Sequence, residues 1–243
     1  MGVVIAVLSG KGGTGKSTTA AALGCALSEL GRSVLCVDAD AELRNLDLCL
    51  GLEDEALLDY GDVLAGRCEA EKALAASPLF PSLKLLPAPQ EALRQGPEGL
   101  IAQLRESFDY CLVDYPGGLA GSAREAARLA DRILVVATAD HCSHRDAEKI
   151  AQVLRREGAS DVYLLMNRIS PRLLKAMDLT LDDSMDRIGL RLIGYVPEDP
   201  RVSLALNAGK PLLAADKRPL RGAAAAFRRI AKRLDGQRVP IRR

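Results

Sequence analysis

The chain has 243 residues, of which 48% are hydrophobic and 27% are charged, and its formal net charge is +1. This apolar content excludes a largely disordered protein, because a disordered chain lacks the side chains that would offset its ordering entropy. No apolar run approaches the roughly 18 residues of a spanning helix, and no basic leader precedes the first apolar stretch, so we expect neither a membrane span nor a secretory signal.

Short apolar runs and helical patterns alternate along the chain. In chain order, the runs that predict buried strands are Val3–Leu8, Ser33–Asp38, Leu83–Pro87, Tyr110–Asp114, Ile133–Ala137, Val162–Asn167 and Leu190–Val196. Apolar spacings of three and four predict helices between them, for example over Ser17–Leu30, Ser122–Ala130 and Ala147–Arg156. This order predicts an α/β fold with a mostly parallel, twisted sheet and helices on both faces. No linker interrupts the pattern, so we expect a single domain over residues 1–243.

A glycine-rich segment joins the first predicted strand to the first predicted helix. It matches the phosphate-loop pattern G-x-x-x-x-G-K-[ST] and consists of Gly10, Lys11, Gly12, Gly13, Thr14, Gly15, Lys16 and Ser17. Glycines let backbone N–H groups approach phosphate oxygens closely, and the helix that follows adds its positive end. We expect Lys16 to contact the β- and γ-phosphates and the Ser17 hydroxyl to bind Mg²⁺. The segment therefore predicts a P-loop NTPase.

Three aspartates follow predicted strands, at the edge where side chains of a parallel sheet meet a ligand. Asp38 ends the second predicted strand, and Asp40 follows two residues later. We expect Asp38 to hold the hydration shell of Mg²⁺ and Asp40 to orient or deprotonate the attacking water, although Asp40 could instead be a turn residue that caps a helix. Asp114 ends a later apolar strand in the Walker B pattern, which supplies a carboxylate to the metal's outer shell.

The segment from Lys11 to Thr18 resembles the deviant Walker A motif of the MinD/ParA class of ATPases, which has a second lysine early in the loop. The resemblance implies that the loop, Thr18 included, binds ATP, that ATP is hydrolysed to ADP and phosphate, and that ATP drives homodimerisation. It also implies that Lys11 reaches across the dimer and stabilises transition-state charge on the partner's nucleotide, as an arginine finger does.

Other segments resemble the septum-site (MinD) branch of this class, namely residues 38–47, residues 165–168, and residues 194–199 with 207–211. The resemblance implies that Asn167 hydrogen-bonds adenine, that Arg168 flanks the base and that Pro197 lines its pocket. It further implies a switch that regulates division-site placement through a membrane and through partners of the MinC/MinE type. The alternative is a ParA-like ATPase that binds DNA nonspecifically and partitions DNA or positions cargo. A metabolic enzyme or an iron–sulfur scaffold is a third class, but the scaffold lacks the support of a C-x-x-C pair.

Three features depart from the pattern of that class. Tyr115 stands after the Walker B aspartate, where Ser or Thr is usual, so we expect a hydroxyl near the metal or the γ-phosphate to be displaced. Gly117-Gly118 replaces the usual Ala-Gly and is more flexible. The branch normally finishes with a short amphipathic helix that inserts in the bilayer, and this chain stops about where that helix would begin.

Positive charge is concentrated in a basic C-terminal helix and tail, residues 217–243. These residues hold ten Lys or Arg and one acid, a net charge of +9, whereas the other 216 residues have a net charge of −8. An apolar stripe at steps of three and four predicts the helix and consists of Leu220, Ala224, Phe227, Ile230, Ala231 and Leu234. The resemblance implies that this is the last helix that packs on the core, with its arginines in solvent. The alternative is that the basic side chains contact anionic lipid headgroups or DNA.

The cysteines indicate a reducing compartment. The six thiols form no C-x-x-C pair and most have apolar neighbours, so we expect reduced core residues rather than disulfides. Cys142 lies in the segment from His141 to His144, where we expect an ordinary polar loop rather than a metal site. Together with the basic tail, these features predict a cytoplasmic protein that can attach peripherally to the inner membrane face.

Overall fold

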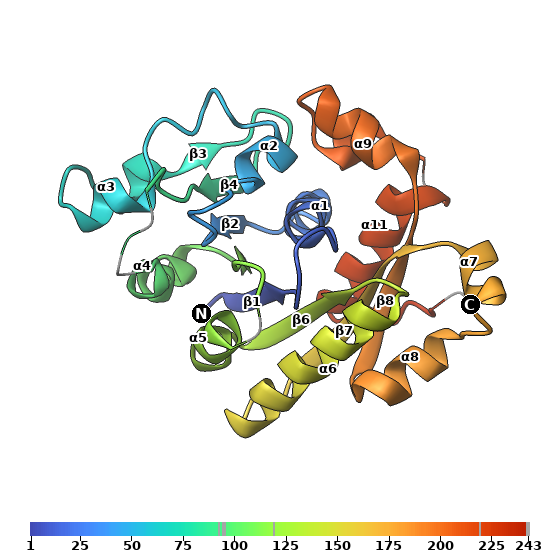
Figure 1. Cartoon of the computed structure of the whole chain (residues 1–243). Coiled ribbons are helices and arrows are strands. Elements are labelled where there is room, and N and C mark those ends of the chain that lie inside the picture. The colour runs from blue at the N-terminus through green and yellow to red at the C-terminus, as the bar shows by residue number, and fades with distance from the viewer. Residues whose placement is uncertain (92, 94–95, 119, 219, 242–243) are drawn as a thin grey trace.

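The computed structural model describes residues 1–91, 93, 96–118, 120–218 and 220–241, so Pro219, Arg242 and Arg243 of the predicted tail lie outside the described residues. One eight-stranded sheet has the order β3-β4-β2-β5-β1-β6-β7-β8, with helices on both faces (Figure 1). Its strands are β1 Val3–Leu8, β2 Val34–Asp38, β3 Ala75–Ala76, β4 Leu83–Leu86, β5 Tyr110–Asp114, β6 Arg132–Ala137, β7 Val162–Ile169 and β8 Arg191–Pro197.

The sheet is parallel throughout except where β3 pairs with β4 in the antiparallel direction. All seven predicted strands are present, and their ends differ from the prediction by two residues or fewer. The prediction missed β3 because two residues are too few to show a repeating pattern. The predicted α/β fold with a mostly parallel sheet is thus confirmed.

One or more helices lie between consecutive strands along the chain, except between β3 and β4. The helices are α1 Lys16–Glu29, α2 Leu46–Leu50, α3 Tyr60–Leu64, α4 Glu98–Leu104, α5 Gly121–Leu129, α6 His141–Arg156, α7 Pro171–Ala176, α8 Leu181–Ile188, α9 Pro200–Asn207, α10 Leu212–Ala215 and α11 Gly222–Leu234, with short 3₁₀ turns at Ala70–Ala73 and Arg105–Ser107. No helix within the described ranges is long and apolar enough to cross a bilayer.

The core consists of two apolar layers, one on each face of the sheet. In β1, Ile5 and Val7 belong to one layer, whereas Val4 and Ala6 belong to the other. This alternation follows from the two-residue period of a strand. The first layer is covered by α1 and α11, and the second by α5 and α6. The central strands are thus packed on both faces, and the phosphate loop begins at the carboxyl end of one of them, β1.

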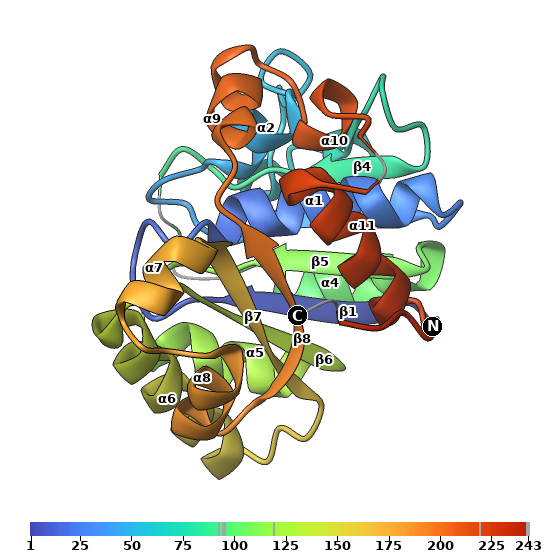
Figure 2. The same cartoon turned by 90° about the vertical axis from the view of Figure 1, so that its right-hand side faces the viewer.

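The last helix packs into the first of these layers. In α11, the run Ala223–Phe227 is buried, and the helix lies against α1 and β8 (Figure 2). The prediction of a core-packed helix is therefore confirmed. Leu220 was wrongly placed on its apolar stripe, because the helix begins only at Gly222 and Leu220 is 65% exposed.

The expectation that the arginines of α11 are solvated is wrong for two of them. Arg228 donates from Nε to Glu29 at 2.6 Å, and Arg233 donates to the carbonyl oxygens of Ile193 and Val239. Both side chains are partly buried because α11 lies against the sheet, where loop and strand-end carbonyls need donors.

The segment from His141 to His144 is the first turn of α6 and not a loop, so that expectation was wrong. The helix starts early because Asp140 caps it, accepting a hydrogen bond from Ser143 N at 2.9 Å. Cys142 is exposed in this turn. All six cysteines are free thiols, four of them buried, as predicted.

Candidate functional site

The phosphate loop leaves β1 and enters α1 in the conformation that its glycines permit. Gly13 and Gly15 have φ values of +79° and +85°, in the left-handed region that other residues rarely adopt. A Cβ on Gly15 would lie 2.3 Å from Nδ2 of Asn167, so a side chain there is also sterically excluded. In the described chain no side chain caps the first turn of α1, which leaves its N–H groups available to an anion.

A cleft of about 620 Å³ opens over this loop. It is lined by Ser9, Lys11, Gly12, Gly13, Thr14, Gly15, Lys16, Ser17, Thr18, Asp40, Glu42, Leu43, Asn45, Leu48, Cys49, Pro116, Gly117, Leu206 and Asn207. The predicted loop residues from Lys11 to Thr18 thus share one cleft with Asp40, which reaches it from beyond β2. Gly10, which begins the loop, packs instead against Asp146 of α6, whose Cβ lies 2.4 Å from where a Cβ of Gly10 would be.

Lys16 lies among carboxylates at the floor of the cleft. Its side chain is 8% exposed, and Nζ lies 2.7 Å from Oδ1 of Asp114 and 3.8 Å from Oδ2 of Asp40. Asp114 ends β5 and is fully buried, which raises its pKa, while the Lys16 ammonium acts in the opposite direction. The ion pair therefore offsets part of the desolvation of both groups.

The acids suit a hydrated magnesium ion better than a metal cage. Among the residues with described positions, no group of three or more His, Cys, Asp or Glu side chains could hold a metal. Oδ2 of Asp114 is buried and has no hydrogen-bond partner within the described chain. Mg²⁺ typically uses one or two protein oxygens, waters and substrate phosphates, so Asp114 and the Ser17 hydroxyl fit it once a nucleotide is bound.

Asp38 organises the loop that follows β2. Its Oδ1 accepts a hydrogen bond from Asp40 N at 2.9 Å, and its Oδ2 accepts one from Leu46 N at 3.0 Å. Burial raises the pKa of Asp38 to about 7, the nearby Asp114 carboxylate adds to the rise, and the two backbone donors oppose it. Each carboxylate oxygen keeps a further lone pair that could accept a hydrogen bond from metal-bound water. The role of Asp38 in the hydration shell of Mg²⁺ stays a prediction.

Asp40 has one carboxylate oxygen turned to the loop and the other toward Lys16. Oδ1 accepts a weak hydrogen bond from Leu43 N at 3.3 Å, while Oδ2 lies near the Lys16 ammonium. The side chain lines the cleft and is nearly buried. This position is compatible with the predicted role in orienting water, which remains a prediction.

Lys11 makes an ion pair within its own chain. Its Nζ lies 2.9 Å from Oδ1 of Asp140, and this hydrogen bond raises the pKa of Lys11. Partial burial acts to raise the pKa of Asp140, but hydrogen bonds from Lys11, Thr138 and Ser143 outweigh it and hold that pKa well below its usual range. The Lys11 side chain is 36% exposed, so it has room to move. Because its ammonium is paired with Asp140, it must leave that carboxylate before it can reach a second copy of the chain.

The predicted base-binding residues, Asn167, Arg168 and Pro197, line a second cavity of about 270 Å³ next to the loop, which we call the base cavity after this prediction. Asn167 donates from Nδ2 to the Thr14 carbonyl at 2.7 Å and accepts from Arg168 N at 2.9 Å, so its amide supports the loop from below. Arg168 has a φ of +56° and pairs with Glu198 at 2.9 Å. Pro197 also lines this cavity. The structure brings these residues together, and their contact with adenine stays a prediction.

Tyr115 does not occupy the cleft. Its side chain is 1% exposed and packs in the core layer under α5, whereas Pro116 and Gly117 line the cleft. Burial is the main cause of its raised pKa, and Glu98 and Glu125 add to it. The Tyr115 hydroxyl therefore takes no place near a phosphate.

Sequence reasoning missed several residues of the site. The sequence did contain a signal for Asp140, the partner of Lys11. Asp140 follows a predicted strand at the same edge of the sheet as Asp38 and Asp114. The sequence held no comparable signal for three other residues, beyond their place near the last strand. Glu198 pairs with Arg168, and Leu206 and Asn207 of α9 line the phosphate cleft.

Comparisons with known proteins agree with this geometry. The family model of the CobQ/CobB/MinD/ParA nucleotide binding domain matches residues 5–212. The septum site-determining protein MinD of Synechocystis is 38% identical over 247 residues, which cover 99% of this chain and 92% of the relative. MinD of Bacillus subtilis is also 38% identical, over 99% of this chain and 92% of the relative.

Solved structures show the same relationship. MinD in a MinC:MinD complex from Aquifex aeolicus has a TM-score of 0.90 and 36% identity, over 99% of this chain and 98% of that one. MinD from Pyrococcus horikoshii, complexed with Mg-ADP, has a TM-score of 0.84 and 31% identity, over 97% and 96% of the two chains. A ParA family ATPase from Chlorobium tepidum, at 22% identity, shares the fold. With its phosphate loop and the buried acids beside it, the chain belongs to the septum site-determining MinD branch of the MinD/ParA family of P-loop ATPases.

Proposed function

We propose that this chain is an ATP-hydrolysing switch that dimerises on Mg-ATP and regulates the placement of the division site. The observation that carries the proposal is the buried lysine of the phosphate loop, Lys16, which lies between Asp114 and Asp40 at the floor of the cleft. The similarity to septum site-determining proteins over 99% of the chain supports the cellular role.

The residues of the cleft divide the work of hydrolysis. Lys16 would exchange Asp114 for the β- and γ-phosphate oxygens, and Ser17 and Asp114 would hold Mg²⁺ directly and through water. Bound Mg²⁺ neutralises charge that develops on the phosphate oxygens. Asp40, which lies 3.8 Å from the Lys16 ammonium, would orient the attacking water.

The dimer would form across the open side of the cleft. Exposed leucines at its mouth support this, because Leu43 is 65% exposed and Leu206 is 37% exposed. A second copy would cover them and bring its own Lys11 to the γ-phosphate. An effector of the MinC kind would then recognise the ATP-bound dimer, by analogy with the Aquifex MinC:MinD complex.

An anionic surface is the second partner that we propose. Four basic side chains, Lys217, Arg228, Arg229 and Lys232, line a groove of about 890 Å³ with Phe80 and Leu213 in its floor. The only acid among the described residues of its lining is Glu29, which pairs with Arg228, so the basic charge remains in excess. We call this the basic groove. Residues of α1, α10 and α11 line it together with residues 79–82, which precede β4. These elements lie close together in Figure 2. Its charge suits the headgroups of an anionic membrane, which would make the protein peripheral at the inner membrane face.

A ParA-like DNA-binding role is the second candidate, and the same groove favours it, since nonspecific DNA binding depends on positive charge alone. Sedimentation of the ATP-bound and ADP-bound protein with anionic liposomes and with duplex DNA separates the two. We expect ATP-dependent sedimentation with liposomes. Sedimentation with DNA alone would favour the second candidate.

Calorimetry and analytical ultracentrifugation test the switch itself. We expect Mg-ATP to bind with measurable heat and to convert a monomer into a dimer, while Mg-ADP binds without dimerisation. A protein that bound no Mg-ATP, or that dimerised equally with both nucleotides, would contradict the proposal.

A further inference from the structure

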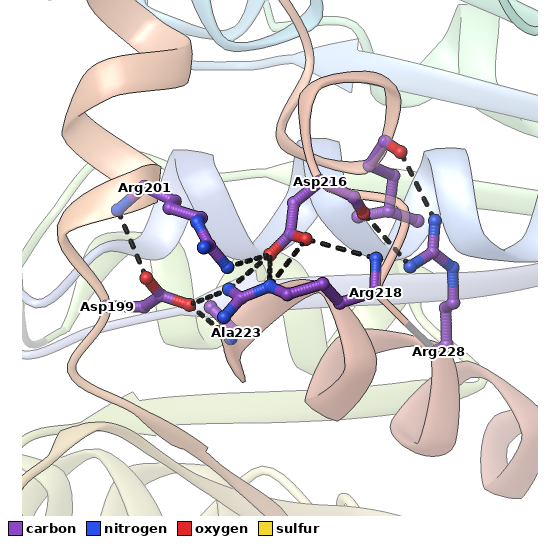
Figure 3. A network of polar contacts seen from close by, with 7 residues as sticks. Asp199, Arg201, Asp216, Arg218, Ala223 and Arg228 are labelled. Atoms are coloured by element: carbon purple, nitrogen blue, oxygen red, sulfur yellow. Dashed lines mark hydrogen bonds and ion pairs between the residues drawn. The ribbon is translucent and has the colours of Figure 1, made fainter. Parts of the chain in front are cut away.

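One carboxylate caps two helices beside the base cavity. Asp199 precedes α9 and accepts a hydrogen bond at Oδ1 from Arg201 N at 3.1 Å. Its Oδ2 accepts from Ala223 N at 3.1 Å, in the first turn of α11 (Figure 3). Arg221 occupies the N-cap position of α11, but its side chain makes no capping hydrogen bond within the described part of the chain. The distant Asp199 provides that hydrogen bond instead. The two helices are thus joined through a single side chain.

Arg218 holds that carboxylate from the other side. Its Nη2 donates to Oδ2 of Asp199 at 3.0 Å and to Oδ2 of Asp216 at 2.6 Å, while Nε donates to Oδ1 of Asp216 at 2.8 Å (Figure 3). Asp216 is 4% exposed, and its carbonyl oxygen accepts from Arg228 of α11 at 3.2 Å. Planar, bidentate pairs of this kind are among the strong and directional hydrogen bonds of proteins.

Gly222 leaves room for this arrangement. A Cβ on Gly222 would lie 2.4 Å from Oδ2 of Asp199 and 2.5 Å from Nη2 of Arg218, and the residue has a φ of +83°. Only glycine allows both the left-handed backbone and the close approach of the two charged groups. The start of α11 is therefore shaped around the ion pair.

The helix that this cluster fixes has little apolar anchorage of its own. Ala205 is the one buried residue of α9, all of whose residues are described. Yet α9 and the residues before it form one wall of the base cavity through Pro197, Asp199 and Val202, and Phe227 of α11 also lines it. The polar contacts of Asp199 and Arg218 therefore contribute much of what sets the distance between those two walls.

We propose that Arg218 is a positioning residue for the nucleotide base: together with Asp216, it holds Asp199 and thereby fixes α9 against α11 at the width that the base requires. The inference rests on the proposed nucleotide binding. It adds a residue that lies 20 positions beyond Glu198 in the chain and outside the lining of both cavities. Arg218 acts only through Asp199, so its loss should weaken binding of the base and leave phosphate binding intact.

Two ligands separate these effects. Mg-ADP uses the base cavity and the phosphate loop, whereas inorganic tripolyphosphate with Mg²⁺ has no base and uses the loop alone. We expect Arg218→Met to bind ADP about tenfold more weakly, as the loss of a charge-assisted hydrogen bond implies, with unchanged tripolyphosphate affinity. Arg218→Lys, whose single ammonium cannot bridge both carboxylates in a fixed fork, should lose part of this affinity. Arg156→Met, on the exposed end of α6, is the matched control and should match the wild type.

The measurement is isothermal titration calorimetry on the full chain, after a thermal melt that confirms cooperative folding. If Arg218→Met does not fold, Arg218→Lys provides the same comparison. Equal losses of ADP and tripolyphosphate affinity, or an unchanged ADP affinity in a folded Arg218 variant, would overturn the inference. A wild-type protein that binds neither ligand would instead refute the proposed function.

Discussion

The two lysines of the phosphate loop differ in burial and in the free energy of their ion pairs. The Lys11 side chain is 36% exposed and that of its partner Asp140 is 48% exposed, and such exposed pairs contribute about 0 to 1 kcal/mol. Lys16 is 8% exposed, and removal of either member of its buried pair with Asp114 costs about 3 to 5 kcal/mol. Lys11 can thus leave its partner at low cost, whereas Lys16 remains in its own cleft.

Lys11→Ala should abolish ATP-dependent dimerisation and leave ADP binding by the monomer nearly unchanged. The reason is that Lys11 points to Asp140 rather than to its own loop, so its own nucleotide does not depend on it. Analytical ultracentrifugation with ATP and calorimetry with ADP give the two readouts, and Lys175→Ala on the exposed face of α7 is the control. Turnover equal to that of the wild type would exclude a role of Lys11 at the partner's nucleotide.

Asp40→Ala should trap the ATP-bound dimer. The phosphate contacts of the loop remain in this variant, whereas the carboxylate that orients water is lost, so hydrolysis should slow by about 10² to 10⁴-fold. A phosphate-release assay and ultracentrifugation measure the two effects, with Asp54→Ala on an exposed turn as the control. If the Asp40 variant hydrolysed ATP at the normal rate, the carboxylate would have no part in orienting water.

The raised pKa of Asp38 predicts how stability depends on pH in the nucleotide-free protein. Its pKa rises from 3.8 to about 7 on folding, so the folded protein binds more protons than the unfolded chain between these values, and the contribution of Asp38 to stability falls as pH rises through them. Asp38→Asn cannot titrate, so its stability deficit relative to the wild type should shrink from pH 4 to pH 7. Urea unfolding at a series of pH values measures this. A deficit that stays constant or grows would contradict the raised pKa.

At the level of elements, α6 shows how a polar first turn conceals a helix in the sequence. Its apolar spacing becomes regular only from Ala147, while the turn before it is held by the cap at Asp140 and by the Ser143 hydroxyl, which accepts from Thr138 N at 2.9 Å. The cap and the Lys11 ion pair use the same carboxylate oxygen, Oδ1 of Asp140. The start of α6 is therefore connected directly to the phosphate loop.

Two substitutions at Asp140 separate the cap from the ion pair. Asp140→Ala removes both and should lower the free energy of unfolding by about 1 kcal/mol or slightly more, the usual cost of a lost N-cap. Asp140→Asn retains an oxygen that can cap and loses the charge, so a few tenths of a kcal/mol is expected, as for an exposed pair. Chemical denaturation measures both values. Equal losses in the two variants would mean that the charge, and not the cap, stabilises this end of α6.

The sequence predicted those elements whose pattern is local. Apolar runs revealed the strands, and the glycine spacing revealed the phosphate loop, because burial and phosphate binding both impose requirements on consecutive residues. The burial of Tyr115 could also have been predicted. It directly follows Asp114, the last residue of β5, and neighbouring side chains along a strand face opposite sides of the sheet, so Tyr115 faces away from the side on which Asp114 meets Lys16. The contacts of Asp199 with Arg218 and Ala223 could not, because they depend on how α9 and α11 pack, across 19 and 24 positions of the chain.

At the scale of the whole molecule, α1 separates the nucleotide cleft from the basic groove. The helix begins at Lys16 in the cleft and ends at Glu29, which lines the groove. Its 14 residues span about 20 Å, at about 1.5 Å per residue. A membrane or DNA bound at the groove would therefore leave the phosphate loop open to nucleotide and to a second copy of the chain.

The basic groove should carry most of the binding to an anionic surface. Reversing two of its charges with Lys217→Glu and Lys232→Glu should weaken sedimentation with anionic liposomes by at least about tenfold at low salt, because each basic residue near such a surface contributes about 1 kcal/mol. The difference from the wild type should shrink as salt rises, since screening weakens every charge contact. Lys149→Glu with Lys175→Glu produces the same change in net charge on α6 and α7, away from the groove, and should have a much smaller effect. Equal losses in the two double variants would show that overall charge, rather than the groove, determines the binding.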